Sequence, residues 1–173
     1  MIVKLSDLKE IRNQNLDKKI VLTIGTFDLF HFEHLKYLMD AKKLGDMLVV
    51  AIKSNFLAKF KHHTRPIIDE KQRIEIIDSL KCVDYTILCD EKMFLETKEK
   101  HKFPLDEQNN KWLYSFYEVF EKLKPDYLYH ENTKSLNPGR KFVSQKFGVT
   151  LKERKRTAIV STTKIIEKIK STN

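Results

Sequence analysis

The sequence predicts an α/β fold, a Rossmann-like doubly wound parallel sheet in a single domain. Three observations support this prediction. Short and almost continuously apolar runs, such as IVLTI (20–24) and MLVVAI (47–52), alternate with longer segments of helical period. Continuous apolar strands joined through helices are typical of parallel sheets covered on both faces. The length of 173 residues suits one ordinary domain.

The expected elements follow one another along the chain. A leader helix falls within residues 1–18, where Leu5, Leu8 and Ile11 share one face. The first strand (20–27), a helix (32–44) ended by Gly45, and a strand (47–52) form the first unit. Helices are then predicted over 70–81, 111–124, 140–148 and 161–170, and strands over 83–88, 126–130 and 149–154.

Residues 91–110 interrupt this pattern. They are polar, contain Pro104 and fit neither the helical nor the strand period well. We expect an insertion on the carboxyl-end side of the sheet or a lid.

Composition and charge restrict the class of protein. With 41% hydrophobic and 33% charged residues the chain is typical of a globular protein. Its longest clean apolar stretch is too short to span a bilayer, and a charge comes too early for a signal peptide, so we expect a cytoplasmic protein without a membrane partner. Cys82 and Cys89 indicate reduced thiols rather than a disulfide or zinc framework.

The formal net charge of +9 raises the question of nucleic-acid binding. Lysines and arginines are scattered among acids instead of gathered with aromatic residues on one stripe. Such a distribution favours a solvated surface that steers small anions inward, so nucleic acid is not the expected partner.

The segment GTFDLFHFEH (25–34) joins the first strand to the following helix. In a doubly wound sheet, ligands bind outside the carboxyl ends of the strands, where helix N-termini present free N–H groups. His31 and His34 stand about 60° apart around such a helix, so both can donate hydrogen bonds to one phosphate chain. For a bare pair at this spacing, histidines bonded to backbone or water are the commoner case.

The surrounding residues resemble a known family. GTFDLFHFEH resembles the GxFDxxHxGH signature of the cytidylyltransferase-like nucleotidyltransferases, in which an HxGH motif grips the phosphates of a nucleoside triphosphate. RPIIDEKQRIEIIDSLKCVDYTI (65–87) resembles their RPxxxxxxRxxxLxxLxxVDxV block. RTAIVSTTKIIEKI (156–169) resembles the RTxGISTTxI block of glycerol phosphate cytidylyltransferases. The three blocks keep their order over about residues 18–90 and 125–170.

The resemblance implies transfer of a nucleotidyl group to a small phosphorylated acceptor, with release of pyrophosphate. It also implies Mg²⁺ bound through the nucleoside triphosphate. The acceptor's phosphate is mostly dianionic at neutral pH, so no general base is expected. Catalysis then consists of positioning and charge stabilisation. The residues assigned to it are His31, His34, Lys59, Lys61 and Arg156.

Further residues are expected to bind the nucleotide. Backbone N–H groups around Gly25, Thr26 and Phe27 can approach the α-phosphate because Gly25 lacks a Cβ, and Asp28 ties the turn together or reaches toward the site. Hydroxyls at a helix N-terminus form a second phosphate cradle, although each is also a good N-cap. They belong to Ser161, Thr162 and Thr163.

The acceptor is expected to meet a different set of residues. Arg73 can fork bidentately onto a phosphate, or instead pair with Glu70 or Asp69 on the surface. A second group follows the strand at 126–130 and departs from the family's paired acids: His130, Glu131 and Asn132. His62 and His63 lack a carboxylate or cysteine at ligand spacing, so no protein-bound metal is predicted.

The choice of nucleotide stays open at this point. The block at 156–163 favours CTP, with a glycerol phosphate-like or sugar phosphate acceptor. The leader helix and the block at 65–87 look equally like the nucleotidyltransferase half of heptose-phosphate adenylyltransferases, which use ATP and a sugar 1-phosphate. CTP is the first expectation and ATP the alternative.

Glu33 stands where the family has glycine between the histidines. Its charge suits the positive first turn of a helix, or it contacts a ribose hydroxyl or the acceptor. The departure also allows a third reading, a non-catalytic nucleotide- or nucleic-acid-binding paralogue. A homodimer is expected because small α/β enzymes often form dimers.

Overall fold

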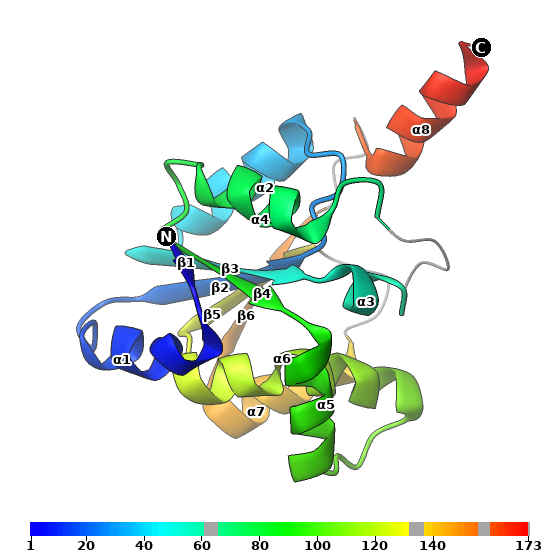
Figure 1. Ribbon diagram of the computed structural model, residues 1–173. Coiled ribbons are helices and arrows are strands. Elements are labelled where there is room, and N and C mark those ends of the chain that lie inside the picture. The colour runs from blue at the N-terminus through cyan, green and yellow to red at the C-terminus, as the bar shows by residue number, and fades with distance from the viewer. Residues whose placement is uncertain (61–65, 132–136, 156–159, 173) are drawn as a thin grey trace.

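A six-stranded parallel sheet forms the centre of the molecule, with the strand order β1-β4-β3-β2-β5-β6 (Figure 1). The computed structural model describes residues 1–60, 66–131, 137–155 and 160–172. The strands are β1 (Ile2–Val3), β2 (Ile20–Gly25), β3 (Met47–Lys53), β4 (Tyr85–Cys89), β5 (Tyr127–Glu131) and β6 (Thr150–Arg154).

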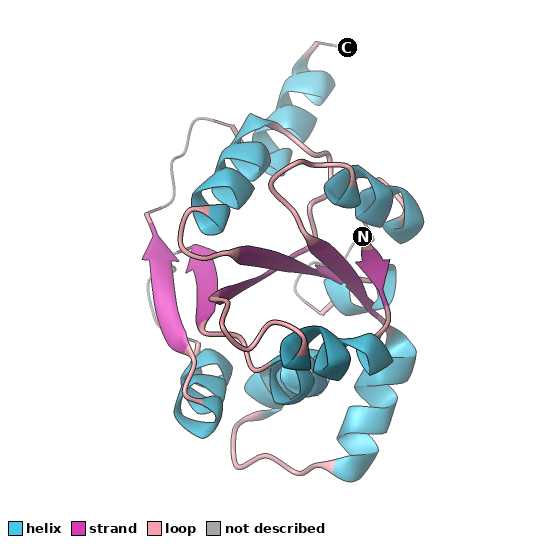
Figure 2. Cartoon of the chain, turned by 90° about the vertical axis from the view of Figure 1, so that its left-hand side faces the viewer, coloured by secondary structure: helices cyan, strands magenta, loops and turns pink. Residues whose placement is uncertain are grey.

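Helices cover both faces of the sheet (Figure 2). One face carries α2 (Phe32–Lys42) and α4 (Glu70–Asp78), and the other carries α1 (Leu8–Asn13), α5 (Glu91–Lys100), α6 (Glu107–Leu123) and α7 (Pro138–Phe147). Two core clusters lie between the sheet and these layers. The remaining helices are η1 (Leu5–Asp7), α3 (Asn55–Ala58) and α8 (Thr162–Ser171). The predicted doubly wound α/β fold is confirmed.

Local sequence explains the longest helix, α6. The carboxylate of Asp106 caps it by accepting from the N–H of Asn109 at 3.0 Å. Apolar side chains recur at helical spacing and are fully buried, as Phe116 and Phe120 show. Lys124 ends the helix in the left-handed conformation, with φ of 44°.

The strand order reverses between β2 and β5. From β2 the chain proceeds outward to β3 and β4, and it then returns to the other side of β2 for β5 and β6. Helix α2, after β2, lies on one face, whereas α7, after β5, lies on the other (Figure 1). Ligands of doubly wound sheets bind at such a reversal, on the carboxyl edge.

The structure differs from the sequence prediction in several places, among them the short helix α3 (Asn55–Ala58), which was not predicted. Strand β1, which pairs with β4, was not predicted because two residues are too short to show a period. The expectation that residues 91–110 lack a regular period is wrong for Glu91–Lys100, which form α5, and for residues 107–110, which begin α6. Asp90 caps this helix, and Met93, Phe94 and Thr97 face the core. In the described segments, none of the helices has the length and apolarity needed to cross a membrane.

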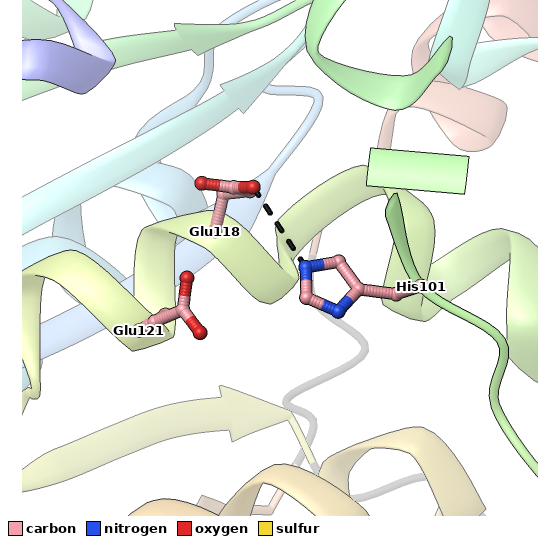
Figure 3. Close-up of side chains that lie close together, drawn as sticks. All are labelled: His101, Glu118 and Glu121. Carbon is pink, nitrogen blue, oxygen red and sulfur yellow. Dashed lines mark ion pairs between the residues drawn. The ribbon is translucent and has the colours of Figure 1, made fainter. Parts of the chain in front are cut away.

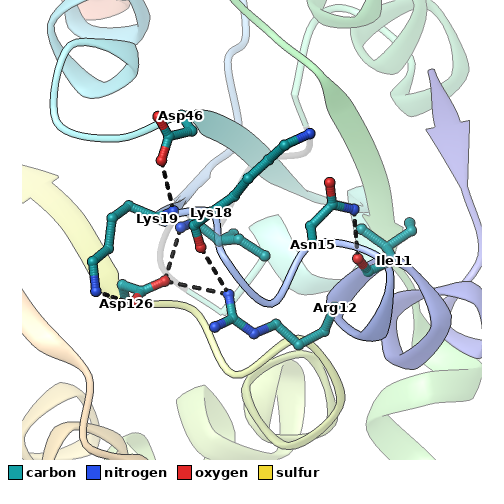
Figure 4. A network of polar contacts seen from close by, with 8 residues as sticks. Ile11, Arg12, Asn15, Lys18, Lys19, Asp46 and Asp126 are labelled. Carbon is teal, nitrogen blue, oxygen red and sulfur yellow. Dashed lines mark hydrogen bonds and ion pairs between the residues drawn. The ribbon is translucent and has the colours of Figure 1, made fainter.

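Asp126 joins several elements at the amino edge of the sheet (Figure 4). Its carboxylate accepts from the backbone N–H of Ile20 at 2.9 Å, from Arg12 Nη1 at 3.3 Å and from Lys19 Nζ at 3.0 Å. Its backbone N–H donates to Ile20 O, and its carbonyl accepts from Thr150 N–H. Burial alone would raise the pKa of Asp126, but these hydrogen bonds and the two cations hold it below its usual value.

Replacement of this carboxylate tests its role. Asp126→Ala should lower the free energy of unfolding by about 2–3 kcal/mol, because Ile20 N–H and the Arg12 guanidinium lose a charged acceptor. Asp126→Asn should cost less, since an amide oxygen still accepts from Ile20. Urea unfolding followed by Trp112 fluorescence measures both. Asp17→Ala removes an exposed carboxylate as the control and should change stability by less than about 0.5 kcal/mol; equal values for Asp126→Ala and this control would contradict the assignment.

Candidate active site

The turn between β2 and α2 carries a strained backbone. Phe27 and Leu29 have φ angles of 53° and 43°, in the left-handed region that residues with a Cβ rarely adopt. The ring of Phe27 folds back over Gly25, where an added Cβ would lie 2.6 Å from ring atom Cε2. The packing of Phe27 therefore favours glycine at position 25, and the close approach of a phosphate to Gly25 stays a prediction.

Two polar side chains hold this turn from outside. Asp28 accepts from the backbone N–H groups of Ile67 and Ile68 at 3.0 and 2.9 Å. Arg73, on α4, is 1% exposed and donates from Nη1 to Thr26 O, and from Nε to Ile68 O at 3.0 Å. The carboxylate of Asp28 thus ties the turn together, which was one of its two expected roles.

The expected contact between Arg73 and an acceptor phosphate is wrong for this structure. The third nitrogen of the guanidinium, Nη2, donates to Asn55 Oδ1 at 3.0 Å, so each nitrogen is already bonded to the protein. The side chain is also closed off from solvent. The arginine of this sequence block is a structural brace, and neither a surface ion pair nor an acceptor ligand describes it.

The two histidines of the first motif stack on one another. His31 stands at the N-cap of α2, and its ring centroid lies 3.8 Å from that of His34, with 17° between the planes. The ring of Phe27 meets His34 edge-on at 5.5 Å, and Phe30 lies 5.7 Å away. Within the described segments, the Nδ1 atoms of both histidines are buried and have no hydrogen-bond partner. Buried polar atoms are usually satisfied, so these two nitrogens indicate a site for a polar ligand.

Burial sets the charge of the histidine pair. It lowers the pKa of His34 to about 4, and the neighbouring His31 adds to the shift. Burial also lowers the pKa of His31, although Glu33 and Glu131 oppose this effect. Both rings are therefore neutral at pH 7, and each offers one N–H donor. An anion bound beside them would stabilise the protonated form and raise both pKa values.

Glu33 points toward the last strand. Its Oε2 accepts from Arg154 Nη2 at 3.0 Å, and its backbone carbonyl lies 3.4 Å from Arg154 Nη1. Both side chains are nine-tenths buried or more. The structure therefore gives Glu33 a role other than ribose or acceptor contact: it anchors the end of β6, two residues before the block at 156–163. Sequence reasoning missed Arg154, and the substitution of the family glycine was the only signal for it.

The third sequence block meets the first at the N-terminus of α8. Thr162 Oγ1 donates to the carbonyl of Asp28 at 3.0 Å. The hydroxyl of Ser161 caps α8 by accepting from Lys164 N–H at 3.2 Å, and Thr163 is exposed. Thr162 is thereby placed against the β2–α2 turn, whereas Ser161 acts as the N-cap that its residue type favours.

The other candidates are less close together. His130 is buried on β5, and its Nδ1 lies 3.1 Å from Arg140 Nη1 and 3.1 Å from the carbonyl oxygen of Glu131. Glu131 is exposed at the end of the same strand, and Lys59 is exposed at the end of α3. Three expected site residues fall outside the described residues: Lys61, Asn132 and Arg156.

A separate group on α5 and α6 has the side chains of a metal site (Figure 3). Ligand atoms of His101, Glu118 and Glu121 lie within 4.8 Å of one another. Glu118 is already ion-paired with Lys100 at 3.5 Å and with Lys122 at 3.3 Å. A divalent cation would have to displace both ammonium groups, so the cluster is better described as an ion-pair network between two helices.

Comparison with known proteins agrees with this geometry. The Cytidylyltransferase-like family matches residues 22–168. The bifunctional protein HldE of Syntrophotalea carbinolica is 40% identical over 93 residues, which are 53% of this chain and 19% of that protein. HldE of Helicobacter pylori strain HPAG1 is 48% identical over 75 residues, 43% of this chain and 16% of that protein. The chain thus spans less than a fifth of the length of these curated relatives.

Solved structures support the fold. The lipopolysaccharide core biosynthesis protein from Thermoplasma volcanium is 27% identical, with a TM-score of 0.57, over 81% of this chain and 97% of that one. Pantoate-beta-alanine ligase from Francisella tularensis, solved with a β,γ-ATP compound and β-alanine, has a TM-score of 0.67 over 98% of this chain and 77% of that one. At 18% identity, the second likeness concerns the fold alone.

The low pKa of His34 predicts a pH-dependent stability. In the unfolded chain this imidazole takes up a proton near pH 6.5, whereas in the folded protein it does so only near pH 4. Between these values the unfolded state binds more protons, so stability falls as the pH falls. From pH 7 to 4.5, a His34→Phe variant should lose about 2 kcal/mol less than the wild type, since one unit corresponds to about 1.4 kcal/mol. Urea unfolding at both pH values measures the losses, and equal losses would refute the buried neutral state.

Proposed function

The chain belongs to the cytidylyltransferase-like family of nucleotidyltransferases, and we propose that it is an adenylyltransferase that transfers AMP from ATP to a sugar 1-phosphate. Two observations favour ATP over the CTP that was first expected. The curated relatives carry the name HldE. The leader helix and the block at 65–87 resemble the nucleotidyltransferase half of heptose-phosphate adenylyltransferases, which use ATP and a sugar 1-phosphate.

The stacked histidine pair is the observation that carries the proposal. The triphosphate of ATP lies at the N-terminus of α2, where free backbone N–H groups and the positive end of the helix favour an anion. His31 and His34 donate to its oxygens from rings that Phe27 and Phe30 hold in place. Because the rings are stacked and packed against Phe27 and Phe30 before the nucleotide arrives, little ordering is left for the reaction itself.

The reaction is a displacement at the α-phosphorus. An oxygen of the dianionic sugar phosphate attacks in line and forms the new P–O bond, the bond to the bridging oxygen of the β-phosphate breaks, and pyrophosphate leaves. No proton has to be removed from the nucleophile, which fits the neutral state of both histidines. These side chains act by hydrogen bonding to charge that develops on the phosphates.

The residues at the turn fit a magnesium ion held by the nucleotide. Asp28 already accepts two backbone hydrogen bonds, and Glu33 is bonded to Arg154. Both carboxylates are thus engaged within the protein, so the triphosphate oxygens themselves would hold Mg²⁺. When bound, the ion neutralises charge on the departing pyrophosphate.

Residue 33 does not weaken the enzymatic proposal. The side chain of Glu33 leaves the first turn of α2 toward β6 and neutralises Arg154, so its charge is balanced within the protein. A nucleic-acid partner remains unexpected, and a homodimer and the cytoplasmic location remain predictions.

Pyrophosphate release tests the substrates directly. The protein with Mg²⁺ is assayed with ATP or CTP against hexose 1-phosphate, heptose 1-phosphate and glycerol 3-phosphate. We expect turnover with ATP and a sugar 1-phosphate. Turnover with CTP alone would support the cytidylyltransferase alternative, and no turnover in any combination would refute the proposal.

The histidine pair is tested with matched variants. His34→Ala should lower kcat by about 10²–10³, because one donor to the developing charge is lost. His101→Ala makes the same chemical change at the end of α5, away from the histidine pair, and should leave kcat within about twofold. A His34→Ala protein that turns over like the wild type would contradict the role given to the pair.

A further inference from the structure

A cavity of about 240 Å³ opens between the end of β3 and the starts of α6 and α7. Among the side chains that line it are three cations, Lys53, Lys111 and Arg140, and the rings of Trp112 and Phe116. Pockets for drug-sized ligands measure about 300–1,000 Å³, so this cavity suits a smaller molecule. It is separate from the histidine pair, and no part of the mechanism above uses it.

The cavity lies at the reversal of strand order. Lys53 follows Ile52, whose partner in the register is Gly25 at the end of β2. Arg140 lies in the first turn of α7, on the other side of β2, with its Nη1 3.1 Å from Nδ1 of His130 on β5. The cavity residues therefore flank β2 at its carboxyl edge, on the face opposite α2. A nucleotide held by α2 and a molecule in this cavity would meet across the end of one strand.

The charge of the lining selects an anion. Of the described lining residues, three are cations and none is an acid. Lys111 also pairs with Glu107 at 2.6 Å, but Glu107 is exposed, and such surface pairs exchange at little cost. Lys53 Nζ lies 5.6 Å from the centre of the Phe116 ring, so an aromatic face helps to keep this ammonium at the cavity.

The aromatic wall selects a ligand with a flat apolar face. Trp112 packs on the first turn of α7, where a Cβ on Gly139 would come within 2.7 Å of Trp112 Cε3. Gly139 thus allows the indole to lie against the helix. The C–H face of a pyranose ring can cover an indole, whereas a short open-chain polyol cannot.

We infer that this cavity is the acceptor site and that it takes a pyranose monosaccharide phosphate. The phosphate lies between Lys53 and Arg140, which border β2, and the sugar ring lies on Trp112. This inference rests on the proposed function and replaces Arg73 as the cationic ligand of the acceptor. It also explains why a buried Arg73 does not leave the acceptor without positive charge.

Binding and kinetics test the cavity separately from the proposed function. Titration calorimetry with hexose 1-phosphate and heptose 1-phosphate needs no turnover. The wild-type chain should bind at least one of them, and Lys53→Met and Trp112→Ala should each weaken this binding at least tenfold. The same variants should raise KM for the sugar phosphate tenfold and leave KM for ATP within twofold.

Conservative variants and a distant control distinguish binding from folding. Lys53→Arg and Trp112→Phe keep the charge and the ring face and should recover most of the affinity. Lys92→Met removes an exposed lysine of α5 that does not line this cavity and should change nothing. The inference is overturned if no sugar phosphate binds, or if Lys53→Met and Trp112→Ala bind it as the wild type does. Binding without pyrophosphate release would leave the cavity assignment standing and refute the proposed reaction.

Discussion

The buried guanidinium of Arg73 is the interaction on which the site depends. It reaches from α4 to the carbonyls of Thr26 and Ile68 and so fixes the turn after β2 against the start of α4. Asp28 joins the same two segments from the other direction. Without these contacts the left-handed conformations of Phe27 and Leu29 would relax, because each carries a backbone strain of about 1–3 kcal/mol. The stacked histidines follow directly from that turn.

The three sequence blocks converge because each supplies one part of this assembly. The first block supplies the strained turn and the histidines, and the second supplies Arg73 and the backbone N–H groups that bond Asp28. The third supplies Thr162, whose hydroxyl bonds the carbonyl of Asp28. Glu33 adds a connection through Arg154 at the end of β6. The residue that departs from the family pattern therefore strengthens the link between α2 and the last strand, β6.

Periodicity predicted most of the fold, since buried parallel strands and amphipathic helices leave strong patterns. It failed for β1 and α3, which are too short to show a period, and for α5, where charged residues surround the buried Met93 and Phe94. The spacing of the histidines placed them at one helix start, and the structure shows them stacked there. The predicted role of Arg73 as a ligand of the acceptor phosphate was wrong, because a motif gives a residue's type and not its burial. Arg154 and the aromatic cavity were missed because their partners lie far apart in the sequence.

The central claim is that the histidine pair binds nucleotide phosphates, and NMR of the imidazole nitrogens tests it most directly. With ¹⁵N-labelled histidine, the pKa of His34 should be near 4 in the free protein. It should rise on addition of Mg²⁺ and a non-hydrolysable ATP analogue, because phosphate oxygens stabilise the protonated ring. The nitrogen resonances of His31 should shift at the same analogue concentration. Saturation of the protein by the analogue with both imidazole spectra unchanged would contradict the account.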